Sequence, residues 1–159
     1  MKSVIIIPAR YKSTRFPGKP LTPILGKPMI LWVAELCSEV VPKACVYIAT
    51  EDFQIKEIVE KAGFNVVMTS NKCLTGTDRI AEAANQIEAD IYINVQGDEP
   101  LLNPSDIVTI IETKKKYKNE VINGYCRISD GEDPENVNIP KVVFNEKKRM
   151  IYMSRQLLP

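Results

Sequence analysis

Basic residues are concentrated at the start of the chain in a way that is suited to binding an anion. Six of them precede the first acidic residue, Glu35, although the formal net charge of the whole protein is only +1: Lys2, Arg10, Lys12, Arg15, Lys19 and Lys27. Like charges held this close repel one another unless an anion lies among them. We therefore expect the segment 8–27 to bind a polyphosphate, whose oxygens accept charge-assisted hydrogen bonds. Solvated surface cations are the alternative.

Proline and glycine give the same segment a shape that is not helical. Four prolines remove backbone donors and fix φ, and two glycines permit left-handed turns: Pro8, Pro17, Pro20, Pro23, Gly18 and Gly26. The segment is not a Walker A motif, because Pro20 follows Gly18-Lys19 where that motif has Ser or Thr. It is not a Gly-x-Gly-x-x-Gly fingerprint either. The pattern predicts a long shaped loop after a strand.

A second candidate group is an acid that follows an apolar run. Asp98 comes after the run 91–95, and Gly97 beside it keeps the backbone clear. Its carboxylate oxygens suit Mg²⁺, which proteins usually share between one or two carboxylates and substrate phosphates. A strand-end turn residue is the alternative for Asp98, and the role of Glu99 stays open. The segment 75–79 is either a helix cap or a surface for a base edge.

Alternating elements are predicted to position these groups. Buried strands are expected at 4–7, 44–49, 65–68 and 91–95. Helices are expected over 29–41, after Asp52, after Asp78 and after Asn103. The alternation indicates an α/β protein with a mostly parallel, doubly wound sheet, whose ligands bind beyond the carboxyl ends of the strands. A further strand is predicted over 121–128, and a hairpin over 141–145 with 150–153.

Composition narrows the classes of function. The chain has 159 residues, of which 45% are hydrophobic, so we expect a single domain over 1–159. It has no histidine, and its four cysteines lack metal-ligand spacing, so zinc is not expected and the thiols are predicted to be reduced core residues. No secretory signal and no membrane-length apolar run are present, which predicts a cytoplasmic protein without a membrane or nucleic-acid partner. Lysines at 114–118 suit a helix end.

Five segments, in order along the chain, resemble one family. They are 7–21 (Ile-Pro-Ala-Arg-Tyr-Lys-Ser-Thr-Arg-Phe-Pro-Gly-Lys-Pro-Leu), 26–30 (Gly-Lys-Pro-Met-Ile), 75–82 (Thr-Gly-Thr-Asp-Arg-Ile-Ala-Glu), 94–100 (Asn-Val-Gln-Gly-Asp-Glu-Pro) and 152–155 (Tyr-Met-Ser-Arg). The family is that of the sugar-acid cytidylyltransferases, and within it the enzymes for 3-deoxy-manno-octulosonate are the most similar.

The resemblance implies a Rossmann-like nucleotidyltransferase fold and the transfer of CMP from CTP to the sugar acid with Mg²⁺ and release of pyrophosphate, a step in lipopolysaccharide synthesis. It also implies site residues by matching position. Ala9 and Arg10 meet the nucleotide, Arg15 and Lys19 its phosphates, Thr75, Gly76 and Arg79 the cytidine, and Gln96 the sugar, while Asp98 binds Mg²⁺ and acts with Lys19 as a catalytic group.

The resemblance covers the N-terminal two-thirds of such an enzyme. By that comparison the chain is truncated at its C-terminus and lacks a second metal carboxylate, a histidine-bearing sugar pocket and much of the contact that makes a homodimer. The alternatives are a nucleotidyltransferase for another sugar, such as the 8-amino sugar acid, a sialic-type acid or a surface polysaccharide, and a nucleotide-binding fragment without turnover.

Overall fold

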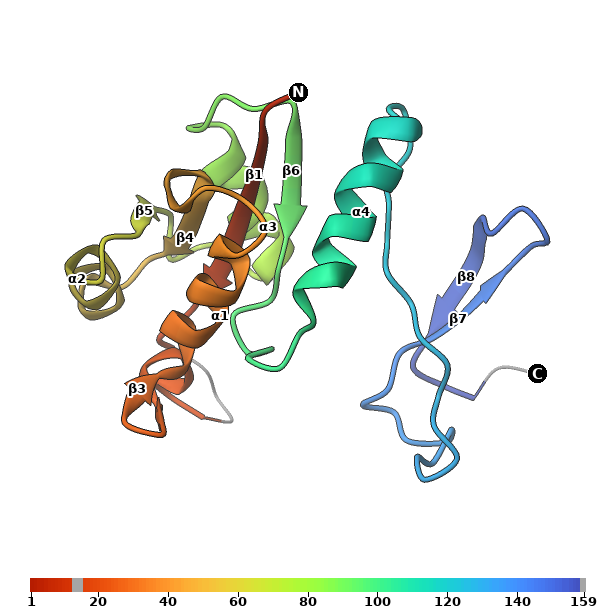
Figure 1. Ribbon diagram of the computed structural model, residues 1–159. Coiled ribbons are helices and arrows are strands. Elements are labelled where there is room, and N and C mark those ends of the chain that lie inside the picture. The colour runs from red at the N-terminus through yellow and green to blue at the C-terminus, as the bar shows by residue number, and fades with distance from the viewer. Residues whose placement is uncertain (13–15, 158–159) are drawn as a thin grey trace. The chain divides into compact units, whose positions relative to one another are not determined.

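A parallel four-stranded sheet lies within residues 1–122 of the computed structural model, which describes residues 1–12 and 16–157 (Figure 1). Its strands are β1 (Ser3–Ala9), β4 (Val46–Thr50), β5 (Asn65–Met68) and β6 (Ile91–Asn94), in the order β5-β4-β1-β6. β4 begins two residues later than predicted, because Lys43–Cys45 form a 3-10 helix before it. The predicted parallel α/β fold is confirmed.

Four α-helices cover the sheet: α1 (Met29–Ser38), α2 (Phe53–Lys61), α3 (Gly76–Ala84) and α4 (Pro104–Lys116). Alternate residues of β1 point to opposite faces, and all of Val4 to Ile7 are fully buried. Ile5 and Ile7 belong to a core shared with apolar residues of α1, α2 and α4, whereas Val4 and Ile6 pack in a second core with residues of α3. Helices on both faces make the sheet doubly wound.

Local capping signals in the sequence mark the helix starts correctly. The Asp52 Oδ1 accepts hydrogen bonds from the backbone amides of Gln54 and Ile55, at 2.9 and 3.1 Å. The Asn103 side chain accepts one from the amide of Ser105 at 3.0 Å. Each such cap typically contributes about 1 kcal/mol to helix stability. At the end of α4, the Lys114 ammonium donates to backbone carbonyls at positions 118 and 120.

The sheet reverses its winding at β1. The chain passes from β1 to β4 and β5 on one side and returns to β6 on the other. β1 pairs with β6 only as far as Ile6 with Asn94, whereas it pairs with β4 as far as Ala9 with Thr50. Pro8, which lacks an amide donor, is tolerated because the β6 side of the strand is already unpaired there. An opening therefore lies between the carboxyl ends of β1 and β6, where such folds bind ligands.

Short elements between β1 and α1 shape the cationic loop. They are the 3-10 helix η1 (Lys19–Leu21) and the strands β2 (Pro23–Ile24) and β3 (Lys27–Pro28), which pair as a small hairpin. The Trp32 indole nitrogen on α1 donates a hydrogen bond to the Ile24 carbonyl at 2.9 Å. The Lys27 ammonium lies 3.4 Å from the centroid of the Trp32 ring. These contacts attach the hairpin to α1.

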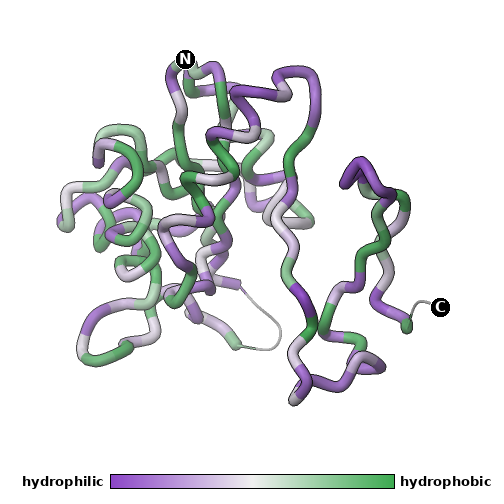
Figure 2. The backbone as a smooth tube through the Cα atoms, turned by 45° about the vertical axis from the view of Figure 1, so that its right-hand side comes forward, coloured by the Kyte–Doolittle hydropathy of each residue, from purple (hydrophilic) through white to green (hydrophobic). Residues whose placement is uncertain are grey.

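The described residues divide into two compact units, 1–122 and 123–159, and the single domain expected over 1–159 stays a prediction. The second unit contains the predicted hairpin, formed by β7 (Lys141–Phe144) and β8 (Met150–Ser154). Figure 2 shows its two strands as largely hydrophobic and the turn between them as hydrophilic. Its apolar side chains are mostly exposed.

The strand predicted over 121–128 is wrong. The structure has no strand there, because no neighbouring strand among the described residues pairs with this segment. β-Branched and aromatic side chains favour a strand only where a partner satisfies the backbone. Val121 is 96% exposed, and the Tyr125 ring instead lies 4.6 Å from the ring of Phe144.

The four cysteines are free, as expected, but they are not all core residues. Cys37 on α1 is fully buried, and burial raises the pKa of its thiol to about 12, so it stays protonated and unreactive. Cys126 is exposed, and Cys45 and Cys73 are half-buried. The core assignment is therefore wrong for Cys126.

None of the helices in the described ranges is long and apolar enough to cross a membrane.

Candidate active site

A cavity of about 520 Å³ lies where β1 and β6 separate. It is lined by the end of β1, by the loops that follow β1 and β6, by α1 and by the start of α3: Pro8, Ala9, Arg10, Phe16, Lys19, Pro20, Met29, Gly76, Gln96, Gly97 and Asp98. Six of these are sequence-predicted site residues, namely Ala9, Arg10, Lys19, Gly76, Gln96 and Asp98. Residues from the cationic loop 8–27, from the segment 75–79 and from the segment that carries Asp98 thus meet around one space. Four apolar lining residues, Pro8, Phe16, Pro20 and Met29, were not predicted from the sequence to be site residues.

The cationic loop and the predicted magnesium acid are in direct contact. The Lys19 ammonium lies 2.6 Å from Oδ2 of Asp98. Their side chains are 43% and 49% exposed, so water and salt screen the pair and it adds little to stability. The contact shows that the Lys19 ammonium and the Asp98 carboxylate lie close together. A phosphate bound by Lys19 would therefore be within reach of a cation held at Asp98.

Gly97 is required by a close approach between the two strand ends. A Cβ atom at this position would lie 2.8 Å from the Pro8 carbonyl oxygen and 3.1 Å from Cδ1 of Ile30. The neighbouring Gln96 side chain is oriented by Asn94, because its amide donates to Oδ1 of Asn94 at 2.7 Å. The absence of a side chain at Gly97 lets the backbone carry Asp98 to the edge of the cavity.

The start of α3 forms another wall. Thr75 and Asp78 make a capping box: Oγ1 of Thr75 accepts from the Asp78 amide at 3.1 Å, and Oδ2 of Asp78 accepts from the Thr75 amide at 2.8 Å. Hydrogen bonds from the Thr75 hydroxyl, and then from its amide, lower the pKa of Asp78. Thr75 is therefore a helix cap, and its contact with cytidine stays a prediction. Arg10 reaches this wall through Nη1, which donates to the Leu74 carbonyl at 3.2 Å.

Glu82 on α3 holds the loop that precedes the helix. Its carboxylate accepts hydrogen bonds from the Ser70 amide at 2.7 Å and from the Cys73 thiol at 3.0 Å. The bond from Cys73, followed by the bond from Ser70, lowers the pKa of Glu82. The same hydrogen bond raises the pKa of the Cys73 thiol, because it stabilises the protonated donor, and burial raises it further.

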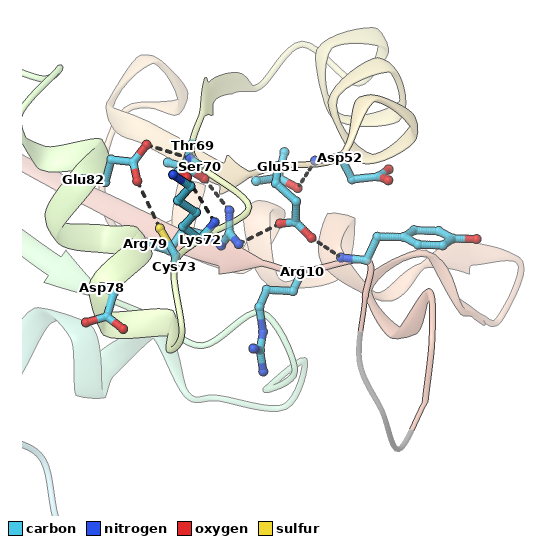
Figure 3. A network of polar contacts seen from close by, with 12 residues as sticks. Arg10, Glu51, Asp52, Thr69, Ser70, Lys72, Cys73, Asp78, Arg79 and Glu82 are labelled. Atoms are coloured by element: carbon cyan, nitrogen blue, oxygen red, sulfur yellow. Dashed lines mark hydrogen bonds and ion pairs between the residues drawn. The ribbon is translucent and has the colours of Figure 1, made fainter.

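Arg79 is not among the residues that line the cavity. Its side chain is 1% exposed, and Nη2 lies 2.8 Å from Oε2 of Glu51 (Figure 3). A direct contact between Arg79 and cytidine stays a prediction. Glu51 was not predicted from the sequence to be a site residue. It nevertheless directly follows the buried strand β4, and an acid after a buried strand is the signal that identified Asp98.

The cluster of six cations is divided by the fold. Lys2 precedes β1 and so lies at the amino end of this strand, whereas the cavity lies at its carboxyl end. The Lys27 ammonium pairs with the Glu35 carboxylate, and Lys12 is exposed. Arg15 lies outside the described residues. Of those that the structure describes, Arg10 and Lys19 are the cations that line the cavity.

The donor set suits a cation that arrives with its ligand. Within the described ranges, no group of three or more His, Cys, Asp or Glu side chains is placed to hold a metal by itself. One carboxylate at Asp98, beside a cation that can hold phosphate, is instead the arrangement that Mg²⁺ uses when substrate phosphates supply further oxygens. The residues present therefore fit Mg²⁺ bound together with a nucleotide.

A doubly wound parallel sheet, with a cationic loop facing an acid at its switch point, defines a nucleotide-binding α/β protein of the nucleotidyltransferase type. Comparison with known proteins gives the family. The sequence model of the cytidylyltransferases matches residues 4–159. The chain belongs to the cytidylyltransferase family.

Individual relatives agree with this assignment. The chain is 40% identical over 158 residues to 3-deoxy-manno-octulosonate cytidylyltransferase of Escherichia coli. The matched region covers 99% of this chain and 64% of that protein. It is 41% identical to the 8-amino-3,8-dideoxy-manno-octulosonate cytidylyltransferase of Shewanella amazonensis, and the match covers 100% of this chain and 67% of the relative. A solved CMP:2-keto-3-deoxy-manno-octonic acid synthetase, complexed with CTP, matches with a TM-score of 0.88 at 39% identity, over 100% of this chain and 66% of that one. The chain thus spans about two-thirds of the length of these relatives.

Proposed function

We propose that this protein takes part in the transfer of CMP from CTP to a sugar acid, 3-deoxy-manno-octulosonate, with release of pyrophosphate. The observation that carries the proposal is the meeting of Lys19 and Asp98, 2.6 Å apart, in a cavity at the switch point of the sheet. Membership of the cytidylyltransferase family supports the base, and the names of the relatives support the sugar acid.

The lining residues have separate roles in this proposal. Arg10 and Lys19 bind the phosphates of CTP, and Asp98 holds Mg²⁺ against them. Ala9 and Gly76 lie along the nucleotide, and Gln96 contacts the sugar acid. The bound ion would supply a Lewis acid that lowers the energy of charge developing on phosphoryl oxygens.

The proposed reaction is an in-line displacement at the α-phosphorus. The anomeric hydroxyl oxygen of the sugar acid forms a bond to phosphorus, and the bond to the oxygen that bridges the α- and β-phosphates breaks. Pyrophosphate leaves with that electron pair, and the hydroxyl proton passes to solvent water. Such a step mainly needs orientation and neutralisation of charge, which basic side chains and a metal carboxylate provide without a histidine.

A second sugar is favoured by one specific finding. The relative from Shewanella amazonensis is named for the 8-amino-3,8-dideoxy sugar acid, and its identity to this chain is similar to that of the Escherichia coli relative. We therefore keep the 8-amino sugar acid as the alternative substrate. A homodimer of the full-length form and a cytoplasmic location stay predictions.

Nucleotide preference tests the proposal directly. With Mg²⁺ present, CTP is expected to raise the melting temperature more than UTP or ATP does, since a ligand that binds only the folded state stabilises it. At a concentration one hundred times the Kd, the gain is about 2.7 kcal/mol. Thermal unfolding with each nucleotide at equal concentration measures the difference. Equal shifts for the three nucleotides would contradict the assignment of cytidine.

Lys19→Ala tests the phosphate site. Loss of a charge-assisted contact to a phosphate costs about 1.5 to 3 kcal/mol, so the Kd for CTP is expected to rise by roughly 10- to 150-fold. Lys115→Ala is the matched control, because Lys115 is similarly exposed and pairs at 2.7 Å with Glu112 on α4. Titration calorimetry measures both variants. Similar binding curves for the two would show that the Lys19 charge is merely solvated.

A further inference from the structure

A buried ion pair lies at the carboxyl edge of the sheet, outside the cavity lining. The Arg79 and Glu51 side chains are 1% and 13% exposed, and Nη2 of Arg79 lies 2.8 Å from Oε2 of Glu51. Nη1 of Arg79 also donates a hydrogen bond to Oγ1 of Thr69. Charges at this depth lose their hydration, so attraction within the pair often does no more than offset that cost.

The pair is not arranged for the greatest stability. Although Nη2 of Arg79 lies 2.8 Å from Oε2 of Glu51, that contact lacks hydrogen-bond geometry, and the buried Nε of Arg79 has no hydrogen-bond partner among the described residues. Buried polar atoms without partners are rare and destabilising. A well-packed apolar pair of similar volume would often stabilise such a site as well or better. The pair therefore calls for a role beyond stability.

Its contacts join segments that surround the candidate site. The other Glu51 oxygen, Oε1, accepts a hydrogen bond from the Tyr11 amide at 3.2 Å. Glu51 follows β4, Tyr11 follows β1, Thr69 follows β5, and Arg79 is in the first turns of α3. Figure 3 shows the Glu51 carboxylate and the Arg79 guanidinium facing each other, with Thr69 beside the guanidinium.

One branch of these contacts leads to the phosphate-binding cations. Tyr11 directly follows Arg10, and the Tyr11 carbonyl accepts a hydrogen bond from the Gly18 amide at 2.8 Å. Gly18 has a left-handed backbone, with φ of 71°, and directly precedes Lys19. The carboxylate of Glu51 thus holds Tyr11, and Tyr11 in turn holds Gly18, so these contacts fix the residues next to Arg10 and Lys19. The other branch, through Arg79, fixes the beginning of α3, where Gly76 lines the cavity.

We propose that Glu51 and Arg79 are positioning residues for nucleotide binding. They set the distance between the cations of the β1 loop and the amino end of α3, and neither touches the nucleotide itself. The inference rests on the proposed binding of CTP and deepens it. It replaces the direct contact expected of Arg79 with an indirect role, and it assigns a function to Glu51.

A double substitution separates positioning from stability. Glu51→Leu with Arg79→Met removes both charges together and leaves neither one buried alone, so the fold is expected to remain and the melting temperature to change by a few degrees at most. The same variant removes the acceptor for the Tyr11 amide and the donor to Thr69. We expect the Kd for CTP with Mg²⁺ to rise at least about tenfold, because misplaced binding groups lose affinity and rate even when the fold survives.

The control is an ion pair that holds no loop. Glu112→Leu with Lys115→Met removes the 2.7 Å pair on the exposed face of α4, and its Kd for CTP should equal that of the wild type. Calorimetry gives the Kd, and thermal unfolding gives the stability. Amide hydrogen exchange at Tyr11 and Gly18, measured without nucleotide, should be faster in the Glu51 and Arg79 double variant alone.

Each result decides the inference. An unchanged Kd in a folded Glu51 and Arg79 double variant overturns it. If that variant does not fold, Glu51→Gln and Arg79→Lys replace it, since each keeps polarity and size, and an unchanged Kd in both overturns it equally. Failure of the wild type to bind CTP refutes the proposed function instead. In that case, amide exchange at Tyr11 still tests whether Glu51 and Arg79 hold the loops together. Faster exchange in the double variant than in the wild type supports this role, and equal exchange overturns it.

Discussion

Asp98→Asn is expected to lower Mg²⁺-dependent release of pyrophosphate from CTP and the sugar acid by about a hundred- to a thousand-fold. Negative charge develops on the phosphoryl oxygens as the bond to pyrophosphate breaks, and stabilisation of such charge by one group is worth about 3 to 4 kcal/mol. The amide keeps the shape of the carboxylate but removes the charge that would hold Mg²⁺. It also leaves the Lys19 ammonium, 2.6 Å away, without its anionic partner.

Binding provides a second readout that does not depend on turnover by this chain. In the wild type, affinity for CTP should rise with Mg²⁺ concentration, and in Asp98→Asn it should become nearly independent of Mg²⁺. Asp106→Asn, on the first turn of α4, is the matched control, because it makes the same change at an exposed carboxylate outside the cavity. Wild-type turnover and Mg²⁺ dependence in Asp98→Asn would make Asp98 a simple turn residue.

Gly97→Ala is expected to damage both the fold and the site. The added methyl would lie 2.8 Å from the carbonyl oxygen of Pro8, a backbone atom that moves only if β1 moves with it. Overpacking of this kind typically costs about 1 to 3 kcal/mol. Because Asp98 is the next residue, a shift of about 1 Å there is expected to raise the Kd for CTP with Mg²⁺ at least about tenfold, since misplaced binding groups lose affinity.

Thermal unfolding and the CTP titration together measure this effect. Gly131→Ala is the control, since a Cβ atom at Gly131 meets nothing within 4 Å. We expect Gly131→Ala to match the wild type in both measurements. A Gly97→Ala protein with wild-type stability and affinity would show that the two strand ends are free to separate, contrary to the close approach seen here.

Much of the framework follows from local sequence. The β-branched run Val4 to Ile7 predicts a strand buried on both faces, because it contains no polar residue that could face solvent. Asp52 and Asn103 predict helix starts, because their side chains reach amides two or three residues ahead. Such signals act over a few residues, so a single sequence is enough to detect them.

Candidate site residues were also recognisable, but only as separate groups. Lys19 stood out by the local excess of positive charge, and Asp98 by its place after a buried strand. Strand order then decided that they meet, because β6 returns to the free side of β1 and brings a residue 79 positions away to the loop. A pattern of strands and helices predicts a parallel sheet, but it does not specify which strands are neighbours.

Tertiary structure alone decided which charges belong to the site. Lys2 and Lys19 look alike in sequence, yet they lie at opposite ends of β1, so only Lys19 lines the cavity. Arg79 matches a motif for the nucleotide, yet packing buries it against Glu51. Burial and pairing depend on long-range contacts, and local sequence does not encode the partner of a side chain. The sequence by itself thus determined the elements and the chemistry available at their ends, and the packing of β1 against β4 and β6 determined which of those groups act together.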